Sequence, residues 1–345
     1  MKEIYPPHYA VFHCIASACP DSCCKEWEIV VDTDSAERYQ NIPGEIGERL
    51  RQAMVVDADG DTIFQENGKR CPFWNEANLC DIHGTLGEDA LCETCRQFPR
   101  VTQDYGDFIE YDISPACPEA ARLLMKLTPE QWQLSEIECA AVMGDLPEYD
   151  DQMMRQRKMQ RCILFACLQD KSATALNQIS HCLKLVEQWT DLSEYASDIV
   201  CTESDVLSFL DECEVLTDDW KIFLQQARAN PKMSLFYDAA VDREVRMFGL
   251  DILYRYYLRT AYSDDPAAIL LPVQLAAFAV CVVLTLTAHM KIRDAEQRLR
   301  IWQLFVKEIE YDGDNLEKLE WQLETNAAFS PAAFRAYFAS LGGVQ

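Results

Sequence analysis

Apolar residues recur every three or four positions through most of the chain beyond residue 150, and this spacing gathers them on one face of an α-helix. The pattern predicts helices over residues 153–169, 173–189, 205–213, 217–229, 233–262, 272–290, 294–311, 315–325 and 331–341. Pro129, Gly144 and Pro147 mark a soft boundary before them. We therefore expect an all-helical domain over residues 127–345.

One apolar stretch, residues 267–290, contains no Asp, Glu, Lys or Arg and is long enough to span a bilayer. It is interrupted by Pro272, Gln274 and His289, and acidic residues precede it. A central helix of the helical domain fits this pattern better than a membrane span, so we predict no membrane association.

The first third of the chain shows shorter elements. We expect an irregular, ligand-held segment over residues 1–24, and the following elements after it: a helix capped by Asp32 or Asp34 and running through Tyr39, a helix over 45–54, a turn at 57–61, a hairpin of strands 62–66 and 69–73 around Asn67-Gly68, a helix over 88–97, a hairpin over 101–114 around Tyr105-Gly106-Asp107, and a helix over 118–126. The predicted fold class is mainly α, with an irregular α+β cysteine-rich module over residues 1–126.

The amino-acid composition and net charge bear on which classes of protein and partner are possible. The 345 residues are 49% hydrophobic, which excludes a disordered chain, and the net charge of −26 repels phosphate backbones, so we expect no nucleic-acid partner. Such a charge attracts a lysine-bearing substrate, although the simpler interpretation is an acidic surface that serves solubility. The N-terminus lacks the apolar run of a signal peptide, and we expect a cytoplasmic protein.

The cysteines carry the chemistry. Sixteen are present, and nine cluster in the first third of the chain: Cys14, Cys19, Cys23, Cys24, Cys71, Cys80, Cys92, Cys95 and Cys117. In a reducing compartment such a cluster favours metal ligation over disulfides. The adjacent Cys23 and Cys24 point apart and are expected to face different metals or different atoms of one cluster. Later cysteines such as Cys201 and Cys213 lie in apolar helical stretches and are interpreted as buried space-fillers.

Nine thiolates with few histidines favour an iron–sulfur cluster, of the 4Fe-4S type, over zinc, although a closed zinc site with four thiolates remains an alternative. The chain has no CxxxCxxC triplet of the radical type. It also has no glycine-rich turn of the dinucleotide-binding type after a predicted strand.

The spacing Cys14-x4-Cys19-x3-Cys23-Cys24 resembles a stretched form of the CxxCxxCC signature of zinc- or iron-chelating proteins. More closely, the segments 19–29, 79–82, 86–100 and 117–122 resemble the flagellin lysine-N-methylase family, with residues 14–122 covering the motifs. The resemblance implies S-adenosylmethionine-dependent methylation of flagellin lysines. It also implies that eight of the nine cysteines match the broader chelating pattern, whereas Cys92 belongs to the methylase-like version.

Other candidate site residues lie near the cysteines. Arg96 and Arg100 are candidates to grip the carboxylate of the methyl donor, or else they balance thiolate charge. Glu110, Tyr111 and Asp112 are candidates to receive a lysine ammonium and remove its proton, and the alternative is that they are ordinary hairpin residues.

Three functions remain open from the sequence. The first is a lysine methyltransferase with an iron–sulfur cluster. The second is a non-catalytic metal-binding adaptor for flagellin or its export apparatus, and the third is a redox or metal-delivery protein. The sequence does not give the oligomeric state.

Overall fold

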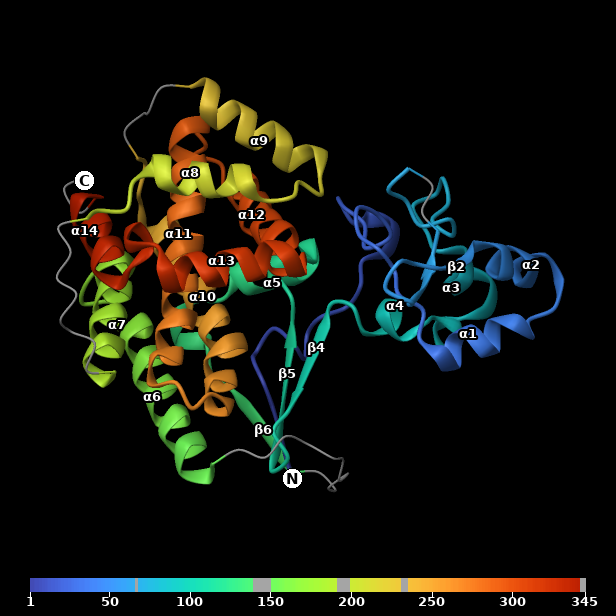
Figure 1. Ribbon diagram of the computed structural model, residues 1–345, viewed down its shortest axis with the longest axis horizontal. Coiled ribbons are helices and arrows are strands. Elements are labelled where there is room, and N and C mark those ends of the chain that lie inside the picture. The colour runs from blue at the N-terminus through green and yellow to red at the C-terminus, as the bar shows by residue number, and fades with distance from the viewer. Residues whose placement is uncertain (66–67, 139–149, 191–198, 231–234, 342–345) are drawn as a thin grey trace.

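Two parts of unequal size make up the structure, a large helical body and a smaller lobe, which Figure 1 shows side by side. The computed structural model describes residues 1–65, 68–138, 150–190, 199–230 and 235–341. The chain passes from strand β1 (Lys2–Tyr5) through the segment 6–24 into the lobe. It returns to the body along strand β4 (Arg100–Asp104). The mainly α class, with an irregular α+β region near the N-terminus and helices after it, is confirmed.

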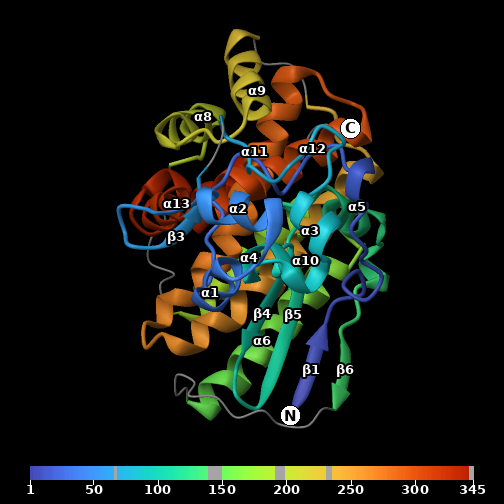
Figure 2. The same ribbon diagram turned by 90° about the vertical axis from the view of Figure 1, so that its right-hand side faces the viewer.

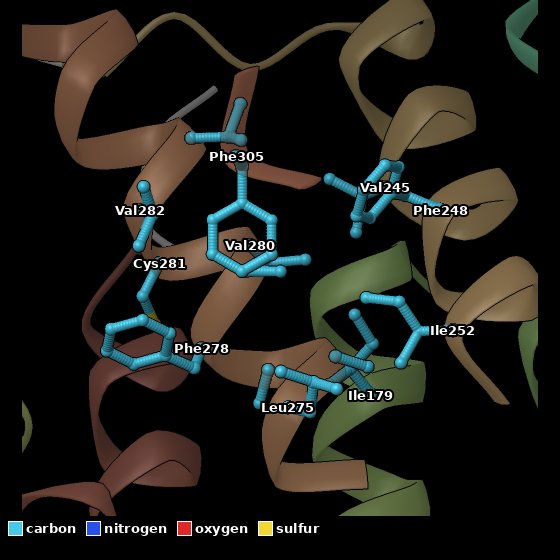
Figure 3. Close-up of a cluster of buried hydrophobic side chains, with 14 of the residues drawn as sticks. Ile179, Val245, Phe248, Ile252, Leu275, Phe278, Val280, Cys281, Val282 and Phe305 are labelled. Atoms are coloured by element: carbon cyan, nitrogen blue, oxygen red, sulfur yellow. The ribbon is translucent and has the colours of Figure 1, made fainter. Parts of the chain in front are cut away.

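Helix α11 (Leu270–Met290) lies at the centre of the body, and all its side chains from Pro272 to His289 are buried. Around it pack α7 (Ala175–Trp189), α8 (Glu203–Glu212), α9 (Asp218–Ala229), α10 (Ala239–Tyr256) and α12 (Ala295–Phe305). Figure 3 shows apolar side chains of α7, α10, α11 and α12 meeting in one cluster. The helix is apolar and long enough to cross a membrane, but 78% of its most apolar window is buried by the protein itself. The prediction of a central core helix is confirmed.

Four further helices complete the body: α5 (Pro118–Lys126), α6 (Asp151–Gln169), α13 (Gly313–Thr325) and α14 (Pro331–Leu341). Every stretch predicted as helical beyond residue 150 contains a helix, with ends that differ locally. The stretch 233–262 is α-helical from Ala239 and continues as a 3-10 turn over Tyr257–Tyr262; residues 233 and 234 lie outside the described part. The stretch 294–311 ends in a π-helical turn, η6 (Val306–Glu310).

A four-stranded sheet covers one side of the body in the order β4-β5-β1-β6 (Figure 2). β4 (Arg100–Asp104) and β5 (Phe108–Ile113) form the hairpin predicted around Tyr105-Gly106-Asp107. β1 (Lys2–Tyr5) runs parallel to β5, and β6 (Ser135–Glu138) pairs with β1. The sequence did not predict β1 or β6. Residues 1–24 are therefore not wholly irregular, because Lys2–Tyr5 gains its partners from segments about 100 residues away.

The lobe is built on α1 (Thr33–Gln40), α2 (Gly44–Ala53), β2 (Met54–Val56), β3 (Thr62–Phe64), α3 (Asp81–Leu86), η2 (Glu88–Ala90) and α4 (Glu93–Gln97). The Asp32 side chain caps α1 by accepting a hydrogen bond from the Ser35 N–H, as predicted. Tyr39 stacks on Phe64, with ring centroids 6.1 Å apart, and Phe64 meets Phe73 edge to face at 5.0 Å, so that the three rings form the centre of the lobe's own apolar core.

The prediction that strand 62–66 pairs with strand 69–73 around Asn67-Gly68 is wrong. β3 pairs with β2, and the segment 57–61 is the turn between them, closed by hydrogen bonds from the Asp59 and Asp61 N–H groups to the Asp57 carboxylate. The segment expected to form a strand at 69–73 bonds instead to the segment that contains Cys24. The Cys71 N–H donates to the Cys24 carbonyl at 2.8 Å. Asn67 lies outside the described residues.

The lobe contacts the body through aromatic and polar side chains. Trp27 packs against Phe98 and stacks on Tyr311, with centroids 4.8 and 5.4 Å away, and Lys69 donates to the Leu216 carbonyl at 2.9 Å. The division of the chain at residue 126 stays a prediction. β6 pairs with β1 across that position.

Candidate metal centre

The nine clustered cysteines come from separate stretches of chain that the fold gathers at the edge of the lobe facing the body. Cys14, Cys19, Cys23 and Cys24 lie in the segment that leads into the lobe, which contains only a short 3-10 turn, Ala16–Ala18. The other five occupy these places: Cys71 in the turn before α3, Cys80 at the N-cap of α3, Cys92 at the N-cap of α4, Cys95 within α4, and Cys117 at the N-cap of α5. The helix predicted over 88–97 is interrupted at Leu91 and Cys92, which are extended, and this break makes Cys92 a cap.

Electrostatic coupling links the nine thiols into one group. The charge of Cys23 acts on Cys19, Cys71, Cys80 and Cys117. The charges of Cys24 and Cys71 act on the pKa of Cys95, which also hydrogen-bonds to Cys92. The charge of Cys14 acts on the pKa of Cys19. Cys23 and Cys24, which the sequence predicted to diverge, also hydrogen-bond to each other through their side chains. The structure therefore brings together every cysteine that the sequence singled out.

Backbone N–H groups point at several of these sulfurs. The Ala16 N–H lies 3.4 Å from the Cys14 Sγ, and N–H groups in the first turns of the following helices favour the thiolates of Cys80 and Cys117. The Phe73 N–H does the same for Cys71. N–H donors aimed at cysteine sulfur are one of the means by which proteins stabilise and tune iron–sulfur clusters.

Burial opposes the charged form of these thiols. It raises the pKa of Cys71 and that of Cys117 to about 12, and it also raises the pKa of Cys19 and Cys80. Thiolates are the metal-binding form, so a positive charge supplied from outside the chain would stabilise this desolvated set. The donor set thus fits a bound cationic metal centre.

A single zinc ion requires closely spaced sulfur ligands. In a tetrahedral zinc site with Zn–S bonds near 2.3 Å, the four sulfurs lie about 3.8 Å from one another. Among the residues the structure describes, the set of three His, Cys, Asp or Glu ligand atoms found within 4.8 Å of one another is His8, Asp112 and Asp251, so no three sulfurs meet that limit. The choice between an iron–sulfur cluster and zinc stays a prediction.

A buried ion network holds the cysteine-bearing segment on the body. Asp21, between Cys19 and Cys23, lies 2.7 Å from Arg300 and 3.4 Å from Lys307, both contributed by the α12–η6 region. Lys307 also lies 2.8 Å from Glu26. Burial would raise the pKa of Asp21, but Lys307, Arg300 and Lys25 outweigh it and hold that pKa below its ordinary value.

The two arginines nominated as donor ligands are exposed beside the cysteines. Arg96 follows Cys95 in α4, and Arg100 begins β4 with its guanidinium 5.4 Å from the centre of the Phe12 ring. Both residues are exposed, so a carboxylate can reach them. Their role as donor ligands stays a prediction.

The three nominated acid–base residues alternate along β5 and face in two directions. Glu110 is buried and accepts two hydrogen bonds from Arg161 of α6, at 2.8 and 2.5 Å. Asp112 is buried near Arg255 of α10, at 3.6 Å. The Tyr111 side chain lies on the opposite face, with its hydroxyl 3.4 Å from Glu3 and its ring 5.7 Å from that of Tyr9. Glu110 and Asp112 thus face the helical body, and their catalytic role stays a prediction.

Sequence reasoning missed the groups that hold the site in place. Asp21 lies about 280 positions before Arg300 and Lys307 in the sequence. Nothing in the local pattern around Arg300 and Lys307 marks them as partners of a distant loop. Trp27, whose indole N–H donates to the Cys23 carbonyl at 2.9 Å, was also missed. Its position four residues after Cys23 was the available signal.

Fold and site together define a mainly helical protein with a cysteine-rich lobe, in which nine thiols converge where the lobe meets the body. The chain is similar to the lysine-N-methylases of Salmonella typhimurium and Salmonella choleraesuis, with 30% identity over 151 residues in each case, and the match covers 39% of this chain and 36% of each relative. It is also similar to the flagellar biosynthetic protein FliU of Salmonella muenchen, with 29% identity over 151 residues and 85% of that relative covered. The resemblance drawn from the sequence is confirmed.

The chain therefore spans about a third of the length of the lysine-N-methylases it matches. No protein-family model matches the chain, and no solved structure matches it.

Proposed function

We propose that this protein is an S-adenosylmethionine-dependent lysine N-methyltransferase that acts on flagellin and carries an iron–sulfur cluster on its nine clustered cysteines. The observation that carries the proposal is the similarity of 151 residues to proteins named lysine-N-methylase and FliU. The convergence of the nine thiols supports the iron–sulfur part, because soft thiolates in this number suit iron–sulfur chemistry.

The reaction is a displacement at carbon. The neutral lysine amine attacks the methyl carbon of the sulfonium donor, an N–C bond forms, and the S–C bond breaks with its electron pair retained by sulfur as S-adenosylhomocysteine. A proton leaves the lysine nitrogen. The protein must therefore attract a protonated lysine, remove its proton and align the amine with the donor.

The residues of this chain divide these tasks in the proposal. Arg96 and Arg100 are exposed, one and five positions after Cys95 in the chain, and are suited to pair with the donor's carboxylate. Tyr111 is half-buried on the face of β5 that points away from the body, whereas Glu110 and Asp112 face buried arginines. A bound iron–sulfur cluster would supply an open iron for the donor's amino and carboxylate groups, or else a rigid anchor for the cysteine-bearing segments.

The test is methyl transfer to flagellin followed by intact-mass measurement. Purified flagellin is incubated anaerobically with the full-length protein and S-adenosylmethionine bearing a labelled methyl group. We expect mass increments of one labelled methyl group each, located on lysines by peptide mapping. Flagellin that stays unmodified with cluster-loaded protein and saturating donor would exclude the methyltransferase.

Two controls make the result specific. The variant Arg96→Gln, Arg100→Gln should raise the KM for the donor while leaving flagellin binding intact, because it removes cationic partners for the donor carboxylate. Binding of flagellin without any methyl transfer by the wild type would instead support an adaptor.

A further inference from the structure

A second cluster of ligand-type side chains lies inside the body, away from the cysteines. His8 comes from the turn after β1, Asp112 from β5 and Asp251 from α10. All three side chains are buried, with exposed fractions of 1% for His8, 3% for Asp112 and 0% for Asp251. Three segments that are distant in sequence thus meet at one point beneath the sheet.

The ligand atoms of this cluster face one another without hydrogen bonds. The His8 Nε2 lies 3.7 Å from the Asp112 Oδ1 and 3.9 Å from the Asp251 Oδ1. By hydrogen-bond geometry neither ring nitrogen of His8, neither Asp112 oxygen, nor the Asp251 Oδ1 has a partner, although the Ile113 backbone lies close enough to act on the pKa of His8 and of Asp112. Unpartnered polar atoms at this depth are costly, and several in contact with one another call for a common partner.

Each aspartate presents one oxygen to His8 and the other to an arginine. The Arg255 Nε donates to the Asp251 Oδ2 at 2.9 Å and lies 3.6 Å from the Asp112 Oδ2. Arg255 is itself fixed by an ion pair with Glu310, whose carboxylate also accepts from the Tyr256 hydroxyl at 2.8 Å. Arg255 therefore orients both carboxylates so that their Oδ1 atoms converge on the imidazole, as outer partners orient metal ligands elsewhere.

The charge of the cluster is not balanced by the protein alone. Asp112, Asp251 and Glu310 oppose a single cation, Arg255, and burial together with Arg255 lowers the pKa of His8 to about 3, which keeps the imidazole neutral. With all three carboxyls ionised, two negative charges would remain in a buried site. Two protons or one divalent cation would neutralise them. Burial raises the pKa of both Asp112 and Asp251, as expected for carboxyls that lack a full counter-charge.

We propose that His8, Asp112 and Asp251 bind one divalent transition-metal ion through the Nε2 and the two Oδ1 atoms. One ligand atom from each residue lies within 4.8 Å of the other two, and for separations of 3.7 Å, 3.9 Å and up to 4.8 Å the point equidistant from three atoms is roughly 2.0–2.5 Å from each, which is the range of metal–nitrogen and metal–oxygen bonds. One imidazole with two carboxylates suits Zn²⁺ or Mn²⁺.

Such an ion would act as a structural joint. It ties the segment that runs from His8 toward Cys14, and the segment that runs from Asp112 toward Cys117, to α10 of the body. Both cysteine-bearing arms would then begin from one fixed point. The site is separate from the cysteine centre and does not depend on the methyltransferase proposal.

The test uses Mn²⁺ as the probe, because thiolates compete poorly for this ion. Full-length protein treated with EDTA is titrated with Mn²⁺, and the free ion is counted from its six-line EPR signal. We expect one bound equivalent in the wild type and at least about tenfold weaker binding in His8→Gln. The control His289→Gln removes another buried histidine, which is hydrogen-bonded to the Asn230 carbonyl, and should bind Mn²⁺ as the wild type does.

A measurement on the wild type covers the case in which His8→Gln does not fold. Mn²⁺ should raise the Tm of the EDTA-treated wild type by several degrees, since a ligand that binds only the folded state stabilises it. An unchanged Tm, or Mn²⁺ binding that is equal in wild type and His8→Gln, would overturn the proposal and leave protons as the neutralising charges.

Discussion

Cys71 and Cys213 show at the residue scale that burial does not distinguish a proposed metal ligand from a cysteine interpreted as a space-filler. Both side chains are 7% exposed, and burial raises the pKa of each thiol to about 12. Their surroundings differ. Cys71 senses Cys23, Cys80 and Cys92, whereas the Cys213 thiol lies within hydrogen-bonding reach of the Phe209 carbonyl of its own helix, at 3.5 Å.

This pair gives a matched prediction. Cys71→Ser should strip metal and lower the Tm of the protein, because metal binding and folding are coupled in such centres. Cys213→Ser should leave the metal content unchanged. Elemental analysis of both purified variants measures the difference, and equal metal loss from the two would mean that the division of cysteines into ligands and fillers is wrong.

The anchoring carboxylate Asp21 gives a prediction with a defined pH dependence. Its pKa is lower in the folded than in the unfolded state, so its stabilising contribution is fully present above the ordinary aspartate pKa near 4 and is lost as pH falls through the folded value. Asp21→Asn should therefore destabilise the protein at pH 7, by about 3–5 kcal/mol for a broken buried pair.

Denaturant unfolding at several pH values measures this contribution. The difference in unfolding free energy between wild type and Asp21→Asn should shrink as the pH is lowered below about 4. A difference that stays constant from pH 7 to pH 3 would contradict the assignment of Asp21 as a charged anchor.

Strand β5 shows at the scale of the element how alternation assigns roles that the sequence could not separate. Glu110 and Asp112 point into the body and Tyr111 points away from it, as the period of two in a β-strand requires. The hairpin around Tyr105-Gly106-Asp107 was predictable because it is local. The partner that turns Glu110 inward, Arg161 on α6, was not, because it lies 51 positions away.

The same distinction explains the other successes and failures of sequence reasoning. Asp32 as the α1 cap, Pro118 at the start of α5 and the apolar α11 are local signals, and all were found. The β1–β5 pairing and the meeting of His8 with Asp251 depend on segments that only the complete fold brings together. The clustered cysteines are the exception among contacts between distant segments, because their number in the first third of the chain predicted a common site.

The Glu110–Arg161 pair supports a prediction about stability. Glu110→Gln should lower the free energy of unfolding by about 3–5 kcal/mol, since it leaves Arg161 buried without its counter-charge. Glu130→Gln is the control, because Glu130 pairs with Lys171 on the exposed surface and its loss should leave the Tm unchanged. If both variants melt alike, the buried pair is not a structural tie between β5 and α6.

The charge of the whole molecule, −26, bears on how a lysine-rich surface of flagellin would meet the protein. Opposite charges steer two macromolecules together at long range, and added salt screens this attraction as the Debye length shortens. The kcat/KM for methylation of intact flagellin should therefore fall as salt rises through the physiological range, with a smaller change in kcat. A kcat/KM that is indifferent to salt would reduce the acidic surface to a solubility feature.

The central claim is that nine cysteines from separate stretches of chain hold an iron–sulfur cluster where the lobe meets the helical body. The most direct measurement is the iron and acid-labile sulfide content of full-length protein purified without oxygen, with zinc determined on the same sample. We predict brown protein with iron and sulfide in near-equal amounts, as in a 4Fe-4S cluster. Colourless protein that contains stoichiometric zinc and no sulfide would contradict the account.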